Sequence, residues 1–298
     1  MRPSFLSPSK RGEGARTIAL CASIDQDDSA SSTSDPAMTR LAANLSMMFN
    51  EVPFLDRFET AARHGFKAVE FLFPYEHPAA EIAARLERHG LTQALFNLPP
   101  GDWAKGERGI AIFPERKAEF AAGVDTALRY AKALNCKKLH VMAGIVPDGA
   151  DRAALEATYV ANLQLAADRA ALLAIEILIE PLNPRDMPGY FLVSFGQARD
   201  ILAKVDRPNA KLQLDLYHRQ MSAGGLADAT REFWPLTGHV QIAGVPGRHE
   251  PDIGEINYRY LFELIDSLGY DGWIGCEYRP KAATADGLGW AKAYGITS

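Results

Sequence analysis

Cysteine is scarce in this chain, and the number of cysteines is odd. The 298 residues include three, Cys21, Cys136 and Cys276. An odd, low count gives no disulfide framework and suits a reducing cytosol, so we expect a cytoplasmic protein. Cys136 and Cys276 lie beside or inside expected strands. Because free cysteine is often buried, we interpret both as small core residues rather than as nucleophiles.

The chain also lacks an excess of basic charge and a long apolar run. Lysine and arginine number 32 against 37 acidic residues, which gives a formal net charge of −5. Nucleic-acid backbones are bound by clustered lysine and arginine, so this balance argues against a nucleic-acid partner. A local cationic patch would still allow a small anionic substrate. No apolar run is long enough to cross a bilayer, and we expect no membrane partner.

Glycine-rich phosphate-binding motifs are missing as well. Neither Gly-x-Gly-x-x-Gly nor a phosphate loop follows any apolar run, which argues against a doubly wound dinucleotide-binding fold. What is present, from Leu41 onward, is an alternation of short apolar runs with amphipathic stretches of helix length. This alternation is typical of α/β proteins with a parallel sheet. Eight such units predict a single (β/α)8 TIM barrel.

The expected elements follow this alternation. Strands are predicted at residues 41–49, 66–73, 91–98, 137–144, 175–180, 211–216, 239–243 and 273–278. Helices are predicted at residues 53–63, 79–89, 115–134, 151–174, 195–204, 226–234 and 258–267, with a last short helix near Trp290. Residues 1–38 are rich in Ser, Arg and Asp and have little apolar periodicity. We therefore expect a disordered extension there, before a barrel domain at 39–298.

Four apolar runs in the C-terminal half each end in an oxygen-bearing side chain. These side chains belong to Glu180, Asp215, Gln241 and Glu277. They are separated by roughly 30 residues, which is the length of one strand-plus-helix unit of a closed barrel. We therefore place them at the ends of four successive strands, where such barrels carry their chemistry. Three carboxylates and an amide at one mouth would need a cation, and oxygen ligands favour a hard divalent metal.

Other polar residues near the strand ends allow more than one interpretation. His218 follows an expected ligand by three residues and is expected to bind substrate or a ligand. Arg248 lies in a glycine-rich loop, where it would either bind a substrate carboxylate or pair with Glu250 or Asp252 at the surface. His140 either points into the barrel or is a satisfied core histidine. In the third loop, a lid or merely solvated side chains are expected for Lys105, Glu107 and Arg108.

Several longer strings carry a family resemblance. They are HVQIAGVPGRHEPDIGEINY, GWIGCEY, AANLSMMF, AVEFLFPY and NLPPGDWAKGERG. Through them, residues 39–298 resemble the hydroxypyruvate isomerase family, part of the wider group of xylose-isomerase-like barrels. The resemblance implies a (β/α)8 barrel in which Glu180 and Glu277 form a proton-transfer pair. It implies a set of metal ligands made up of Glu180, Asp215, Gln241 and Glu277. Many relatives in the wider group carry His where this chain has Gln241, and the amide favours Mg²⁺ or Mn²⁺ over Zn²⁺.

The resemblance also implies an activity. The enzyme would be an isomerase acting on a small anionic 2-oxo-3-hydroxy acid, whose carbonyl and hydroxyl exchange places through an enediolate. Hydroxypyruvate would give tartronate semialdehyde. The metal would chelate the two reacting oxygens, His218 would steer the hydroxyl proton, and Arg248 would hold the substrate carboxylate. Hydroxypyruvate is the expected substrate. The alternative is the substrate of the related 2-oxo-tetronate isomerases, which is one carbon longer, and the sequence does not separate the two.

Two functions of other classes compete with the isomerase. A DNA-repair endonuclease on the same barrel would need several zinc ions, hence more histidine ligands, and a basic surface. A catalytically silent barrel could bind a sugar acid as a sensor, but ligand binding alone does not require the pair Glu180 and Glu277. The sequence also leaves open whether the chain forms a homo-oligomer.

Overall fold

Eight parallel strands close into a ring in the computed structural model, which describes residues 39–297. Each strand pairs with its successor along the chain, and β8 pairs with β1. The strands are β1 (Leu41–Asn44), β2 (Ala68–Glu70), β3 (Thr92–Asn97), β4 (Lys138–His140), β5 (Glu176–Ile179), β6 (Ala210–Asp215), β7 (Thr237–Ile242) and β8 (Ile274–Cys276). The predicted (β/α)8 barrel is confirmed. The expected disordered extension at 1–38 lies outside the described residues.

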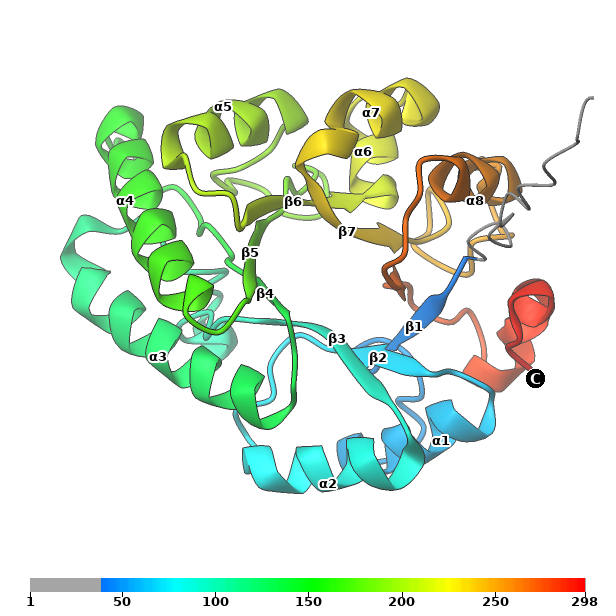
Figure 1. The fold of residues 1–298 in the computed structure, drawn as a ribbon. Coiled ribbons are helices and arrows are strands. Elements are labelled where there is room, and N and C mark those ends of the chain that lie inside the picture. The colour runs from blue at the N-terminus through cyan, green and yellow to red at the C-terminus, as the bar shows by residue number, and fades with distance from the viewer. Residues whose placement is uncertain (1–38, 298) are drawn as a thin grey trace, which may run out of the picture. The chain divides into compact units, whose positions relative to one another are not determined.

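Helices surround this ring on its outside (Figure 1). They are α1 (Arg57–Arg63), α2 (Ala79–His89), α3 (Lys117–Ala133), α4 (Arg152–Ala171), α5 (Phe195–Val205), α6 (Leu216–Ser222), α7 (Leu226–Phe233) and α8 (Tyr258–Ser267). Their buried faces follow the amphipathic sequence pattern, as in α2, where Ile82 and Leu86 are buried one turn apart. The helix expected near Trp290 is a 3-10 helix, Thr284–Tyr294.

Several strands, such as β2 and β4, are shorter than the sequence predicts, and two further differences have a clear cause in hydrogen bonds. The first strand ends at Asn44 rather than at residue 49, because the Asn44 side chain accepts a hydrogen bond from the Ser46 amide at 3.1 Å and its carbonyl accepts one from the Met48 amide at 2.8 Å. These bonds turn the chain although the following residues are apolar. The second difference is α6, which begins directly after β6 and was not predicted. Asp215 caps α6 by accepting a hydrogen bond from the Tyr217 amide at 2.7 Å.

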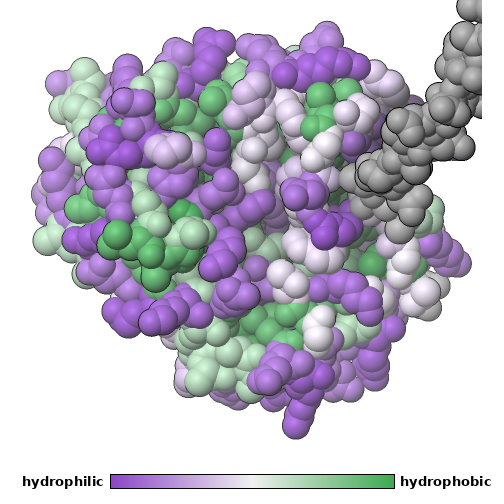
Figure 2. Space-filling model, viewed as in Figure 1, coloured by the Kyte–Doolittle hydropathy of each residue, from purple (hydrophilic) through white to green (hydrophobic). Residues whose placement is uncertain are grey.

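The apolar core confirms the expectation for two of the cysteines. Cys136 and Cys276 are both free and fully buried, and burial raises the pKa of the Cys136 thiol to about 12. Hydrophilic residues cover most of the face drawn in Figure 2, with separate apolar patches between them. Within residues 39–297, no helix combines the length and the apolarity that a bilayer span requires.

Candidate active site

The four side chains expected at strand ends come together at the carboxyl end of the barrel. Glu180 and Glu277 directly follow β5 and β8, Asp215 is the last residue of β6, and Gln241 lies near the end of β7. All four are at most 6% exposed. Glu180, Gln241 and Glu277 line one cavity of about 420 Å³. Asp215 Oδ2 lies 3.8 Å from both Arg248 Nη2 and His218 Nε2, which belong to residues that line this cavity.

Burial and mutual repulsion dominate the electrostatics of these carboxyl groups. Burial, followed by the charges of Glu277 and Asp215, raises the pKa of Glu180 well above its usual value. Burial also raises the pKa of Asp215, although Arg248 opposes the change. Burial raises the pKa of Glu277 to about 8, again against the effect of Arg248. The site therefore holds more acidic groups than its own cation can neutralise.

Arg248 is the cation inside this cluster. Its Nη2 donates to Glu277 Oε2 at 2.8 Å and lies 3.8 Å from Asp215 Oδ2. Its guanidinium carbon lies 4.9 Å from the centre of the Tyr217 ring, a cation–π arrangement. Burial alone would lower the pKa of Arg248, but the surrounding carboxylates raise it. Arg248 therefore faces the cavity.

The alternative of a surface ion pair for Arg248 is wrong. Its ion pairs run to the buried carboxylates of Glu277 and Asp215. Glu250 is itself buried, and its Oε1 accepts a hydrogen bond from the Lys281 amide at 3.0 Å.

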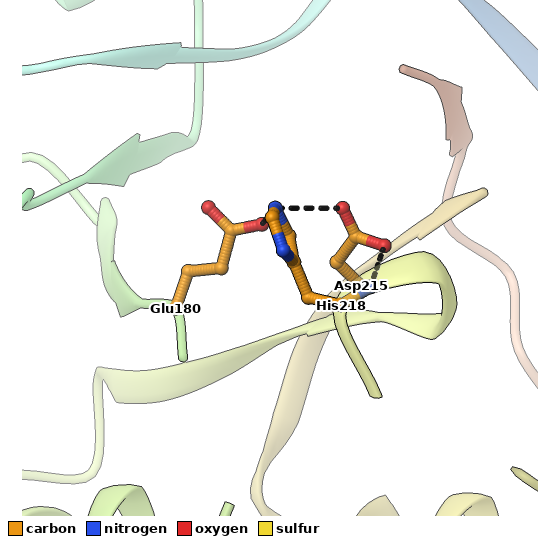
Figure 3. Close-up of side chains that lie close together, drawn as sticks. All are labelled: Glu180, Asp215 and His218. Carbon is orange, nitrogen blue, oxygen red and sulfur yellow. Dashed lines mark hydrogen bonds and ion pairs between the residues drawn. The ribbon is translucent and has the colours of Figure 1, made fainter. Parts of the chain in front are cut away.

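His218 lies between two of the carboxylates, as Figure 3 shows. Its Nε2 is 4.0 Å from Glu180 Oε1 and 3.8 Å from Asp215 Oδ2. The cap that Asp215 provides for α6 explains this position, because His218 falls in the first turn of the capped helix, and its own amide also bonds to Asp215 at 3.2 Å. Burial, followed by the charge of Arg248, lowers the pKa of His218 well below its usual value. The ring is therefore neutral at pH 7.

The residues at the mouth fit a divalent cation. Glu180 Oε1 and Asp215 Oδ2 are buried oxygens without a hydrogen-bond partner among residues 39–297. Ligand atoms of Glu180, Asp215 and His218 lie within 4.8 Å of one another. Buried acidic oxygens without partners are costly unless a cation or a proton balances them. Hard oxygen donors of this kind are suited to Mg²⁺ or Mn²⁺.

A buried polar network behind the mouth was missed by the sequence analysis. Glu70, at the end of β2, accepts hydrogen bonds from Asn44 Nδ2 at 3.0 Å, from Gln241 Nε2 at 2.8 Å and from His239 Nε2 at 2.7 Å. Gln241 Oε1 in turn accepts a bond from Gln213 Nε2 at 2.5 Å. The network fixes which way the Gln241 amide points. The signal in the sequence was weak, since Glu70 is an acidic residue inside the apolar run at residues 66–73 and not at its end.

The structure also shows where the other residues with two possible interpretations lie. His140 lines the cavity, with Nε2 at 3.8 Å from Glu180 Oε2, and burial lowers its pKa to about 3. It therefore points into the barrel and is neutral. In the third loop, Trp103 lines the cavity and the Arg108 guanidinium stacks on it at 3.9 Å. The remaining two expected loop residues form ion pairs outside the cavity lining, Lys105 with Asp102 and Glu107 with Arg116.

A closed parallel barrel with acidic side chains at the carboxyl ends of its strands defines a TIM-barrel protein whose site occupies the usual end of the fold. Comparison with known proteins narrows this class. The family described as "Xylose isomerase-like TIM barrel" matches residues 58–294. A 2-oxo-tetronate isomerase from Cupriavidus necator is 58% identical over 86% of this chain and 99% of the relative.

Two further relatives match this chain over nearly their whole length. A hydroxypyruvate isomerase from Escherichia coli is 46% identical over 86% of this chain and 100% of the relative. A Brucella melitensis crystal structure, described as an AP endonuclease of family 2, is 54% identical with a TM-score of 0.85, over 86% of this chain and 99% of that one. The chain belongs to the xylose isomerase-like TIM-barrel family and, within it, is an isomerase of the group that includes hydroxypyruvate and 2-oxo-tetronate isomerases.

Proposed function

We propose that this chain is a metal-dependent isomerase that exchanges the C2 carbonyl and the C3 hydroxyl of a small 2-oxo-3-hydroxy acid. The observation that carries the proposal is the pair of buried glutamates, Glu180 and Glu277, whose raised pKa values bring them closer to neutrality beside a site that fits a cation. Perturbed acidic groups converging in one cavity are typical of acid–base catalysis.

We infer a 2-oxo-tetronate as the first candidate substrate and hydroxypyruvate as the second. The 58% identical relative is named for the four-carbon acid, and the 46% identical one for the three-carbon acid. A cavity of about 420 Å³ has room for either acid. Both substrates are small anions, so the proposal includes no nucleic-acid or membrane partner.

The proposed metal is Mg²⁺ or Mn²⁺, and its ligands would be Glu180, Asp215, Gln241 and Glu277. When bound, it would polarise the substrate carbonyl and stabilise the negative charge that develops on the reacting oxygens. Glu70 supports this set by holding the Gln241 amide nitrogen at 2.8 Å, so the amide oxygen would be the ligand atom. This oxygen already accepts a hydrogen bond from Gln213 Nε2 and would use its second lone pair for the metal. The structure would thus supply oxygen ligands only.

The chain's own residues would perform the proton transfers. One of Glu180 and Glu277 would remove the proton from C3, and the other, or the same group, would return it at C2. A group with a pKa near the working pH can both take and return a proton, and such catalysis contributes about 10²–10⁴-fold. His218 would interact with the substrate hydroxyl. Arg248, which already binds a carboxylate at 2.8 Å, would hold the carboxylate of the substrate.

Proton NMR in D₂O with each acid tests the proposal. An isomerase exchanges the carbon-bound proton of its substrate with solvent and forms the isomer, and the two acids are ranked by their rates in parallel assays. Exchange should disappear in at least one of Glu180→Gln and Glu277→Gln, the variant that lacks the group removing the C3 proton, with circular dichroism showing that both variants fold. A barrel that only binds a sugar acid would leave the C–H signal unchanged, and this result would overturn the proposal.

The endonuclease remains the candidate of a second class, because the Brucella melitensis relative is described as one. We rank it below the isomerase, since a net charge of −5 opposes binding to a phosphate backbone. Incubating the same preparation with a duplex that contains an abasic site tests it directly. Strand cleavage that is lost in Asp215→Asn would favour the endonuclease.

A further inference from the structure

His218 receives two hydrogen bonds on the side of its ring that faces away from the carboxylates. Its Nδ1 lies 3.1 Å from the backbone amide nitrogen of Asn183 and 2.8 Å from Asn183 Nδ2. From this contact we propose that Asn183 holds His218 in the neutral form protonated on Nε2. His218 is then a hydrogen-bond donor to the reacting substrate and not a metal ligand. The substrate part of this inference rests on the proposed function.

The direction of both hydrogen bonds is fixed. A backbone N–H can only donate, so Nδ1 must accept from it. The orientation of the Asn183 side chain is also determined, because its Oδ1 accepts from the amides of Arg185 at 3.1 Å and Asp186 at 3.0 Å. Its Nδ2 donates to Asp186 Oδ2 at 3.1 Å and faces the ring. Two donors therefore converge on Nδ1, which must present its lone pair.

A bare Nδ1 places the proton of the neutral ring on Nε2. A doubly protonated ring would set an N–H of His218 against the N–H of Asn183, so the contact disfavours that form too. The Nε2 proton points toward Glu180 Oε1 and Asp215 Oδ2, at 4.0 Å and 3.8 Å. These distances are too long for direct hydrogen bonds. They leave the proton free for an oxygen that enters between the carboxylates.

The same tautomer argues against metal binding by this ring. A metal would take the Nε2 lone pair and move the proton to Nδ1, where it would meet the two donors of Asn183. Histidines that bind metals usually donate their second N–H to an acceptor, and here donors occupy that place. A neutral N–H donor suits a substrate oxygen on which negative charge develops. The cluster of Glu180, Asp215 and His218 would therefore hold a metal through its oxygens only.

The first test measures the tautomer in solution. Wild-type protein with ¹⁵N-labelled histidine is studied by long-range ¹H–¹⁵N correlation, and His218→Ala assigns the signals by their loss. We expect Nε2 to be protonated and Nδ1 bare, with no change of this pattern when MgCl₂ is added. A protonated Nδ1 in the wild type, or a bare Nε2 after Mg²⁺ addition, would overturn the inference. Neither result depends on turnover, so inactivity toward both acids would count only against the proposed function.

A variant of Asn183 and a matched control test whether this side chain determines the tautomer of His218. Asn183→Asp replaces the side-chain donor beside Nδ1 with an acceptor, while the backbone N–H of residue 183 remains. We therefore expect part of the ring population to carry its proton on Nδ1 in this variant, whereas Asn50→Asp, at an exposed position, should leave the pattern unchanged. An unchanged pattern in Asn183→Asp would contradict the assigned role.

Mn²⁺ binding is then measured by electron paramagnetic resonance. His218→Ala should change the dissociation constant less than about threefold, whereas Asp215→Asn should weaken it at least about 10-fold, the scale of losses near metal sites. Equal losses in both variants would make His218 a ligand and refute the inference.

Discussion

We expect Gly275→Ala to destabilise the barrel although alanine normally suits a strand position better than glycine. Gly275 lies in β8 beside the carboxyl group of Glu70. A Cβ atom added there would overlap both oxygens and the carboxyl carbon of Glu70. Its backbone has no left-handed φ angle, so the substitution acts only through this overlap. Either β8 moves away or the carboxylate leaves its place.

The cost follows from the hydrogen bonds that hold the carboxylate. Glu70 is fully buried and accepts from Asn44, Gln241 and His239 at 3.0, 2.8 and 2.7 Å. Hydrogen bonds to charged groups contribute about 1.5–3 kcal/mol each, and an uncompensated buried charge costs about 3–5 kcal/mol. Because part of the network will relax, we expect a loss of about 3–5 kcal/mol in the free energy of unfolding. In a domain of this size such a loss lowers Tm by about 10 °C.

Thermal unfolding followed by circular dichroism measures this effect, with Gly196→Ala as the matched control. Gly196 lies in α5, and a Cβ there meets no atom within 4 Å. Alanine should stabilise that position by about 0.4–1 kcal/mol, since it restricts the unfolded chain. If Gly275→Ala unfolds within about 1 °C of the wild type, Glu70 is not held against β8 and the reasoning fails.

Three further predictions concern the proposed reaction. Glu180→Gln and Glu277→Gln should each lower kcat by at least about 10²-fold without unfolding the protein, because each removes a proton-transfer group; near-normal rates in either variant would contradict that residue's role. Dialysis against a chelator should reduce activity, and Mg²⁺ or Mn²⁺ should restore it, whereas full activity after exhaustive removal would exclude a metal step. Arg248→Lys should raise KM by about 10-fold or more, since lysine cannot form the two-point contact of a guanidinium; an unchanged KM would show that Arg248 does not bind the substrate carboxylate.

The fold was predictable because each barrel unit carries its own local signal. Buried parallel strands are short apolar runs, and the helices outside them are amphipathic. The prediction failed where a single side chain overrides the pattern. Asn44 ends β1 within an apolar run by bonding to the Ser46 amide, and composition does not show such a turn. The start of α6 at Asp215 could have been predicted from the sequence, since aspartate is a common N-cap residue of helices.

The location of a site residue was predictable only where the residue ends an apolar strand. Glu180, Asp215 and Glu277 end apolar runs, and a closed barrel brings such residues to one mouth. Glu70 was missed because apolar residues follow it in the sequence, and only the structure ends β2 at this residue. The pairing of Arg248 with Glu277 lay beyond the sequence, because it depends on how the β7–α8 loop folds back over the mouth. Contacts of this kind require coordinates.

The charges at the mouth connect this ion pair with the proposed chemistry. Glu180, Asp215 and Glu277 carry three negative charges when ionised, and Arg248 supplies one positive charge. A divalent cation would neutralise the remaining two, and such a balance is required because unpaired buried charges cost several kcal/mol each. The metal would then neutralise the Glu277 carboxylate, and Glu277 would no longer require Arg248 as its counter-ion. Arg248 would then be free to bind the anionic substrate. Its contact with Glu277 would belong to the metal-free protein, and its contact with the substrate carboxylate to the protein with metal bound.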